Sequence, residues 1–328
     1  MKLLSETDFR SLIDPDFLIA AADDSYKALS LGKADIPLRT EFVRKDPEHI
    51  VFLMPCFIEK DVFGLKVIAN RADASRPTGW ITASFVMVFD VITNTPLGLV
   101  ASDHLTDTRS AAGIAAATKV LARADTHTLA VYGAGKLALP SIELVCRVRS
   151  FERLIIVSRT RSKVEALKEK VSAMPHLGLE AIEIDHSADA AAEESDVIVT
   201  VTTSTTPVFD GSRVRPGTHV NIGGAFLPTS REIDDAVIQR AALYVDSLDS
   251  CLQRSGDIVI PLGSDAIDRE AIRGEIGGVL AGTVPGRQSD DEITVFKTLG
   301  NAVQDIVLAK RVFERAKEEG RGSVFELL

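Results

Sequence analysis

The chain has 328 residues, of which 45% are hydrophobic and 26% charged, and this ordinary globular composition excludes disordered, collagen-like and disulfide-scaffold proteins. The 37 basic and 47 acidic residues give a formal net charge of −10, and no basic run stands out, so we expect no nucleic-acid partner. The length predicts two domains. Charges interrupt the N-terminus before the apolar core of a signal peptide can form, and no stretch approaches the roughly 20 apolar residues of a membrane span. We therefore expect a cytoplasmic protein without a membrane partner, in which a local cationic pocket could bind a small anion.

The three cysteines, Cys56, Cys146 and Cys251, are widely spaced, and none belongs to a CxxC motif. Their odd number and their spacing argue against a disulfide framework and against a metal site, so no metal is expected. We expect three buried, reduced thiols.

The first hundred residues combine one helical segment with several short strands. Ser5 or Thr7 can cap a helix over residues 5–31, in which apolar residues recur at helical spacing. Short β-rich runs follow, separated by Asn, Pro and Gly, at residues 50–55, 63–69, 83–92 and 97–102. Such runs with turn residues between them predict an antiparallel sheet. The Ala-rich stretch 107–123 predicts a helix that begins near Thr106 or Asp107.

Beyond residue 127 the pattern changes to alternating strands and helices. The expected strands cover residues 128–135, 153–160, 179–184, 196–203, 219–225 and 242–247, and the expected helices cover 140–148 and 161–173. This alternation predicts a parallel sheet covered by helices on both faces. A last helix is expected at about 300–318, where apolar residues again recur at helical spacing.

A glycine-rich turn follows the first of these strands, with Gly133, Gly135 and Ala138 in a GxGxxA pattern after the apolar run LAVY. In a dinucleotide-binding turn the first glycine allows the tight bend and the second lets the backbone approach a pyrophosphate. The small third residue lets the following helix pack on the strand. The N-terminus of that helix then supplies N–H groups to the phosphates. The strand–turn–helix context favours a dinucleotide site over a plain tight turn.

The end of the next strand indicates which dinucleotide binds. NAD sites usually carry an acidic residue there, which accepts hydrogen bonds from the ribose hydroxyls. This chain has Ser158, Arg159 and Thr160 instead, followed by Arg161 and Lys163. Hydroxyls and cations suit a 2′-phosphate, so NADP is favoured and NAD is the alternative. A solvated basic loop is the other interpretation of this segment.

Three cations in the first part of the chain are candidate ligands for an anion. Arg39 follows the run IPL, Lys66 lies inside the apolar strand pattern FGLKVI, and Arg109 lies near the start of the Ala-rich helix. An ammonium inside an apolar strand is costly without a partner. Each of the three is either a structural ion-pair partner or a ligand for a substrate anion, and spacing alone does not bring them together.

Six stretches in order along the chain resemble the ornithine cyclodeaminase/mu-crystallin family: LTDTRSAAGIAAATKVLAR, LAVYGAGKLA, VTVTTSTTPVF, HVNIGGA, ALYVDS and DDEITVFKTLGNAVQDI. The resemblance implies an α/β fold. A Rossmann-type doubly wound parallel sheet, residues 123–295, is inserted into an α+β substrate-binding and dimerisation domain, residues 1–122 plus 296–328. The resemblance also implies a homodimer, and hydride chemistry at the α-carbon of an amino or imino acid whose carboxylate the protein binds.

Matching motif positions imply roles for individual residues. Arg39, Lys66 and Arg109 resemble the family's cationic cluster for the substrate carboxylate, which fixes the α-carbon for reaction. Lys66 and Arg109 are the implied catalytic residues, and Lys66 resembles a group that polarises the amine or helps move a proton. The implied cofactor contacts are Gly133, Gly135, Lys136, Ala138, Ser158, Arg159, Thr160, Thr202, Thr203, Gly224, Lys297 and Gly300.

The chain departs from the family pattern at two positions of the expected substrate pocket. In the family that the chain resembles, cyclodeaminases and the archaeal alanine dehydrogenase have an aspartate at the position of Phe226. A histidine is frequent in the family at the position of Thr82. Phenylalanine cannot exchange protons. The departures favour an NAD(P)H-dependent reductase of a ketimine or 2-imino acid, such as pyrroline-2-carboxylate or piperideine-2-carboxylate. The alternatives are an ornithine or lysine cyclodeaminase, an alanine- or opine-like dehydrogenase, and an NADPH-binding crystallin-like protein.

Overall fold

The computed structural model describes residues 1–45, 48–75, 79–184 and 186–326. The chain divides into two compact units. Unit 1 comprises residues 1–109 and 301–328, and unit 2 is the continuous segment 110–300. The first crossing lies inside a helix, whereas the sequence analysis places its two boundaries after residue 122 and before residue 296.

Unit 1 is built on an eight-stranded sheet in the order β16-β1-β7-β6-β5-β4-β2, with β3 also paired to β4. The strands are β1 (Lys2–Leu4), β2 (Ala34–Asp35), β3 (Thr40–Lys45), β4 (Glu48–Ile58), β5 (Val62–Ala72), β6 (Trp80–Asp90), β7 (Pro96–Ala101) and β16 (Ser323–Val324). Paired strands from β2 to β7 run antiparallel, so the predicted antiparallel sheet is confirmed. The sequence analysis does not predict β1, which pairs parallel to β7.

Two helices replace the single helix expected over residues 5–31. Ser5 caps α1 (Glu6–Ser11), as predicted. After a break, α2 (Pro15–Ser30) begins with the side chain of Asp14 as its cap. The proline at its first position has no N–H to donate to a preceding turn, so it can start a helix but not continue one without disruption. The prediction of one unbroken helix is therefore wrong.

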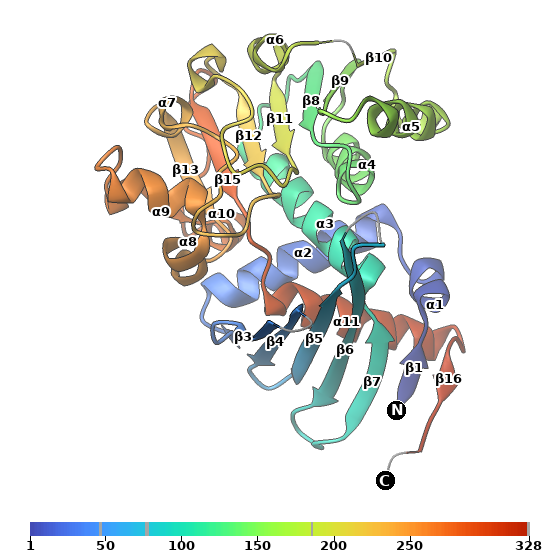
Figure 1. The fold of residues 1–328 in the computed structure, drawn as a ribbon. Helices are drawn as coiled ribbons and strands as arrows, with labels where there is room; N and C mark the ends of the chain where they lie inside the picture. The colour runs from blue at the N-terminus through green and yellow to red at the C-terminus, as the bar shows by residue number, and fades with distance from the viewer. Residues whose placement is uncertain (46–47, 76–78, 185, 327–328) are drawn as a thin grey trace. The chain divides into compact units, whose positions relative to one another are not determined.

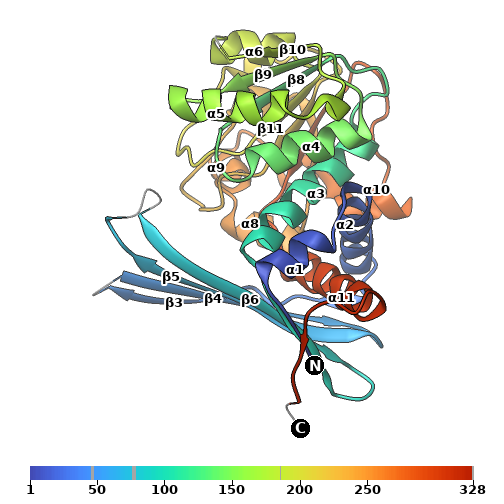
Figure 2. The same cartoon turned by 90° about the vertical axis from the view of Figure 1, so that its right-hand side faces the viewer.

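The last helix expected from the sequence is confirmed as α11 (Ala302–Glu318), which lies against one face of the unit 1 sheet (Figure 2). Its close approach requires a residue without a side chain on β5, because a Cβ on Gly64 would lie 2.5 Å from Cδ1 of Ile306. The buried face of α11 is mostly apolar but includes Asp305. The approach of this helix therefore brings a carboxylate against the sheet.

Unit 2 holds an eight-stranded parallel sheet in the order β10-β9-β8-β11-β12-β15-β13-β14 (Figure 1). The strands are β8 (Thr128–Tyr132), β9 (Arg153–Val157), β10 (Ala181–Glu183), β11 (Val197–Thr200), β12 (His219–Ile222), β13 (Ala241–Val245), β14 (Ile272–Glu275) and β15 (Ile293–Lys297). The helices are the C-terminal part of α3 (Asp103–Leu121), then α4 (Ala138–Val148), α5 (Arg161–Ser172), α6 (Ala188–Glu194), α7 (Asp235–Ile238), α8 (Leu248–Arg254), α9 (Gly256–Gly263) and α10 (Ile276–Ala281).

Both faces of this parallel sheet are covered. Leu129 and Val131 of β8 belong to a core cluster with α4 and α5, whereas Ala130 and Tyr132 belong to a second cluster with α6, α7 and α9. Side chains that alternate between two apolar layers are typical of a doubly wound sheet. The predicted α/β fold with a doubly wound parallel sheet is confirmed.

Several predicted limits of elements shift for local reasons. α3 begins at Asp103 rather than near Asp107, because the side chain of Glu6 accepts from the Asp103 N–H at 2.8 Å and caps the helix from 97 residues away. The strands expected to end at 135, 160, 203 and 225 end at 132, 157, 200 and 222, where the chain turns into loops. The sequence analysis does not predict β14, β15 or the short helices α6 to α10.

The strand order of unit 2 reverses at β8. From β8 the chain proceeds to β9 and β10 on one side, and then to β11 and β12 on the other. The loops that leave β8 and β11 therefore diverge and form a crevice at the carboxyl ends of the strands, where open α/β sheets bind their ligands.

Candidate functional site

A cavity of about 550 Å³ lies at the crevice of unit 2, at the ends of β8, β9 and β11. Its lining residues are Tyr132, Gly133, Ala134, Gly135, Val157, Ser158, Arg159, Thr160, Lys163, Ala188, Val201, Thr202, Thr203, Ser204, Thr206, Pro207 and Val208. Seven predicted cofactor residues are among them, namely Gly133, Gly135, Ser158, Arg159, Thr160, Thr202 and Thr203. The fold thus brings together residues that follow three separate strands.

The two glycines of the turn after β8 meet different requirements. Gly133 has a φ of +108°, and a Cβ there would lie 2.5 Å from the carbonyl oxygen of Val201, so the protein's own backbone requires this glycine. A Cβ on Gly135 would meet nothing within 4 Å. Gly135 therefore leaves open space at the cavity, beside the N-terminus of α4. Its bare backbone fits a turn that phosphates approach closely.

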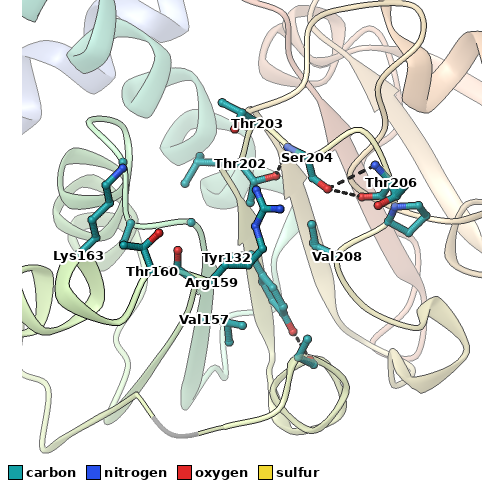
Figure 3. A pocket seen from close by; sticks show the side chains of 17 residues that line it. Tyr132, Val157, Arg159, Thr160, Lys163, Thr202, Thr203, Ser204, Thr206 and Val208 are labelled. Carbon is teal, nitrogen blue, oxygen red and sulfur yellow. Dashed lines mark hydrogen bonds between the residues drawn. The ribbon is translucent and has the colours of Figure 1, made fainter. Parts of the chain in front are cut away.

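The wall of the cavity after β9 is cationic. Arg159, Thr160 and Lys163 are exposed, and among the described residues neither Asp nor Glu lines the cavity. Figure 3 shows the guanidinium of Arg159 extended over the cavity, with the ammonium of Lys163 lying apart from it. The hydroxyls of Ser158 and Thr160 belong to the same wall. A wall with these cations can accept an anionic group.

The other predicted cofactor residues do not line this cavity. Lys136 is exposed in the turn, and Ala138 is buried as the first residue of α4. Gly224 lies in the loop after β12, and the N–H of Gly300 donates to Oδ2 of Asp246 at 2.8 Å.

Lys297, the last residue of β15, departs most from its predicted role. Its side chain is fully buried, donates to the carbonyl oxygen of Ala225 at 2.6 Å and pairs with Oδ2 of Asp257 at 2.9 Å. Burial works against its charge, but the carboxylates of Asp257 and Glu232 outweigh burial and raise the pKa of Lys297. The ammonium is therefore committed to partners inside unit 2 and is not placed on the wall of the cavity.

A second polar cluster lies in unit 1. Lys66 is fully buried and Arg109 is 6% exposed, and both contact the same oxygen, Oδ1 of Asp305. The distances to this oxygen are 2.7 Å from Nζ of Lys66 and 3.1 Å from Nε of Arg109. Nη1 of Arg109 also donates to Oε1 of Gln304 at 3.3 Å. The three charged groups in contact sum to +1.

The electrostatics of this cluster include a further charge, the carboxylate of Asp107, which raises the pKa of Lys66. Burial lowers the pKa of Lys66 to about 8 although the Asp305 carboxylate opposes it, and the guanidinium of Arg109 lowers this pKa as well. Oδ2 of Asp305 is buried and has no hydrogen-bond partner among the described residues. This oxygen therefore needs a hydrogen-bond donor and not an anion. Arg109 keeps N–H donors that a small carboxylate could accept.

The two other predicted substrate residues of unit 1 lie on the same sheet face as Lys66. The guanidinium carbon of Arg39 lies 5.4 Å from the centroid of the Phe52 ring, and the register of β4 and β5 puts this ring on the face that carries Lys66. Oγ1 of Thr82 donates to Oδ1 of Asn70 at 2.8 Å, and Asn70 shares that face too. The sheet face that carries Lys66 thus also presents a cation, an aromatic ring and a polar pair.

Asp305 and Gln304 are the site residues that the sequence analysis misses. Both lie in the stretch NAVQDI of the last helix and are buried. The available signal is a carboxylate and an amide within the buried, mostly apolar face of this helix, where a polar side chain needs a partner. The sequence contains no indication that those partners are Lys66 and Arg109.

Phe226 lies in the loop after β12 in unit 2 and is 44% exposed.

The three cysteines are free, as expected, but Cys146 is partly exposed and only Cys56 and Cys251 are buried. Within the described ranges, no group of three or more His, Cys, Asp or Glu side chains could hold a metal ion. Among the residues that the structure describes, no helix is both long enough and apolar enough to cross a membrane.

The family model of the ornithine cyclodeaminase/mu-crystallin family matches residues 1–320. Delta(1)-pyrroline-2-carboxylate reductase of Bacillus thuringiensis subsp. konkukian is 32% identical over 328 residues, which cover 99% of this chain and 100% of that protein. The structure of Thermococcus litoralis Delta(1)-pyrroline-2-carboxylate reductase in complex with NADH and L-proline has a TM-score of 0.92 at 32% identity, covering 99% and 100% of the two chains. An archaeal alanine dehydrogenase dimer with bound NAD has a TM-score of 0.89 at 29% identity, covering 100% and 99%. The chain belongs to the ornithine cyclodeaminase/mu-crystallin family.

Proposed function

We propose that this protein is an NAD(P)H-dependent reductase of cyclic 2-imino acids, such as pyrroline-2-carboxylate or piperideine-2-carboxylate, which it converts to the L-amino acid. The observation that carries the proposal is the buried cluster of Lys66, Arg109 and Asp305, in which Arg109 keeps N–H donors that a substrate carboxylate could accept. The cavity of unit 2 fits a dinucleotide, and similar chains include pyrroline-2-carboxylate reductases.

The cluster can bind and orient the substrate. A nicotinamide dinucleotide supplies the hydride, and reduction of the C=N bond adds this hydride to the α-carbon and one proton to the ring nitrogen. Arg109 has N–H donors beyond those that Asp305 and Gln304 accept, so it can bind a carboxylate and fix the α-carbon. Lys66, with a pKa of about 8, can donate a proton near neutral pH.

Phe226 favours this reduction over a cyclodeaminase reaction. A cyclodeaminase oxidises an amine, releases ammonia and then reduces the ring imine, which calls for proton exchange at the substrate amine. The cyclodeaminases of the family have an aspartate at the position of Phe226, which can exchange a proton, whereas phenylalanine has no exchangeable proton. A preformed ring imine requires no release of ammonia, so an apolar residue at this position is compatible with its reduction.

The reaction is tested by following NADPH and then NADH absorbance with pyrroline-2-carboxylate and with piperideine-2-carboxylate. We expect oxidation of the cofactor with at least one of these imines, and no ammonia from ornithine in a parallel assay. Release of ammonia from ornithine without net cofactor change would replace the reductase by the cyclodeaminase. Cofactor binding without turnover of any imino acid would favour a binding protein.

We propose NADPH as the preferred cofactor, with NADH as the alternative. The support is the cationic wall after β9, in which Arg159 and two hydroxyls occur and the residues that the structure describes include no carboxylate. A 2′-phosphate is recognised by such a guanidinium, whereas a free ribose 2′-hydroxyl is usually bound by an acidic side chain. The similar structures named above contain NADH or NAD, so this preference is specific to the residues of this chain.

Arg159→Gln is expected to raise KM for NADPH about tenfold while changing KM for NADH less than about twofold, because the guanidinium would contact only the 2′-phosphate. Initial rates with each cofactor measure both constants. Arg213→Gln is the matched control, since this exposed guanidinium pairs with Glu193 at 3.3 Å and does not line the cavity, so both constants are expected to stay unchanged. An equal loss with the two cofactors would contradict recognition of a 2′-phosphate.

We also propose that the protein is a homodimer. A similar alanine dehydrogenase is a dimer, and unit 1 exposes the large apolar side chains Phe42, Phe57 and Phe85, which a second copy could cover. Light scattering of the purified protein measures the mass directly.

A further inference from the structure

We propose that Glu232 is a positioning residue that sets one wall of the cofactor cavity without touching the cofactor. Its carboxylate joins the loop after β11 to the loop after β12. Oε1 accepts from the backbone N–H and from Oγ1 of Thr202, both at 2.7 Å. Oε2 accepts from the N–H groups of Gly224 at 2.7 Å and Ala225 at 2.9 Å. One oxygen therefore serves each loop, and the side chain is fully buried.

The two loops that Glu232 joins are in direct contact. A Cβ on Gly224 would lie 2.2 Å from both the backbone nitrogen and the carbonyl oxygen of Thr202, so only glycine fits there. Thr202 lines the cavity, whereas Glu232 and Gly224 lie behind it. The carboxylate thus acts on the cavity wall through Thr202.

Glu232 is itself fixed by a closed ring of buried contacts. Its backbone N–H donates to Oδ1 of Asp257 at 2.7 Å, and Oδ2 of Asp257 pairs with Lys297 at 2.9 Å. Lys297 donates to the carbonyl oxygen of Ala225, whose N–H donates back to Glu232. This ring explains why Lys297 is buried away from the cavity. A closed network of charged groups holds its members more rigidly than separate pairs do.

The proposal rests on the proposed function, because it takes the ligand of the cavity to be a nicotinamide dinucleotide. A rigid wall spares the ordering of loops when the ligand binds, so loosening it should weaken affinity for the cofactor rather than the chemistry at saturation. A residue with only a structural role would lower the active fraction of the enzyme and leave KM for the cofactor unchanged.

The test uses the full chain and NADPH or NADH as probes, by fluorescence titration and by initial rates. Glu232→Gln keeps the size of the side chain but places an NH₂ group against N–H donors, so it frees one loop. We expect its Kd and KM for the bound cofactor to rise about tenfold, with kcat at saturating cofactor within about twofold of the unsubstituted protein. Glu232→Asp, which keeps both oxygens on a shorter stem, is expected to lie between the two.

Asp234→Asn is the matched control. Its carboxylate also accepts from two backbone N–H groups, those of Gly211 at 2.9 Å and Val237 at 3.2 Å, but it caps α7 and does not line the cavity. We expect it to lower the thermal midpoint without changing Kd. An unchanged Kd in Glu232→Gln, or an equal rise in Asp234→Asn, would overturn the proposal. If Glu232→Gln does not fold, an unchanged Kd in Glu232→Asp overturns it in the same way. Failure of the unsubstituted protein to bind either cofactor would instead refute the proposed function, and the positioning role with it.

Discussion

Replacement of Lys66 by methionine is expected to lower kcat/KM for a cyclic 2-imino acid by about thirty- to four-thousandfold. Truncating one partner of a buried, hydrogen-bonded charge pair between a protein and its ligand typically costs about 2–5 kcal/mol, and about 1.4 kcal/mol corresponds to a factor of ten. The affinity for NADPH is expected to stay unchanged, because Lys66 is not among the residues that line the cofactor cavity. Steady-state kinetics and a cofactor titration measure the two effects separately.

The same substitution is not expected to destabilise the protein. The pKa of Lys66 falls from 10.5 to about 8 on folding, chiefly because burial disfavours the ammonium. The unfolded chain therefore binds more protons between about pH 8 and 10.5, and the contribution of this group to the free energy of unfolding rises with pH across that window. Denaturant unfolding at pH 7.5 and at pH 9.5 should show this rise in the unsubstituted protein and lack it in Lys66→Met.

Activity should show the opposite dependence on pH. If the ammonium binds the carboxylate or donates the proton, kcat/KM falls above about pH 8 as Lys66 loses its charge. Lys66→Arg carries a permanent charge, so this decline is expected to disappear even where the rate is low. Lys310→Met is a suitable control. Lys310 lies on α11, the helix that carries Asp305, and pairs with Asp61 at 2.8 Å, so this variant should retain the activity and its pH profile. A Lys66→Met enzyme with unreduced kcat/KM would remove this residue from the mechanism.

Asp305→Asn is expected to lower the free energy of unfolding by about 3–5 kcal/mol and to abolish turnover. It leaves Lys66 and Arg109 buried without their shared carboxylate, and an unpaired buried charge carries that cost. The asparagine has nearly the same volume, so no cavity contributes to the loss. Urea denaturation measures the stability, and the assay with cyclic imines measures the activity.

Two further variants separate charge from packing. Asp61→Asn breaks the half-buried pair with Lys310 and is expected to cost about 1 kcal/mol or less, since ion pairs open to solvent contribute little. Lys66→Met combined with Asp305→Asn leaves one cation instead of two and should recover part of the stability that Asp305→Asn loses. Additive losses in the double variant would show that the two side chains do not interact.

Local patterns account for the parts of the cofactor site that could be predicted. Gly133, Gly135 and Arg159 follow strands directly, and a strand, a turn and a helix in succession fix where such residues lie. The sequence also contains a signal for the helix break before Pro15, since Asp followed by Pro is a typical helix start. The apolar residues recur at helical spacing across this break, which favours the prediction of one continuous helix.

Contacts between distant residues account for what could not be predicted. Lys66 and Asp305 are 239 residues apart, and nothing local to Lys66 indicates which carboxylate would meet it. No local sequence pattern indicates the partners of Glu232 either, because the loops that contain them become neighbours only when β11 and β12 pair. Lys297 shows the converse case. A family motif predicts where Lys297 lies along the chain. The direction of its side chain depends on its ion pair with Asp257, which no local sequence pattern indicates.

The division of the chain has a consequence for its biosynthesis. Unit 2 is one uninterrupted segment, whereas unit 1 is completed by residues that follow it. A nascent chain that has reached residue 300 already contains every strand of unit 2, but it lacks α11 and with it the counter-ion of Lys66 and Arg109. The domain begun first is therefore finished last. We expect a product released before α11 to retain a cofactor cavity and to be unable to hold a carboxylate, so the ability to bind substrate is acquired only in the final stretch of translation.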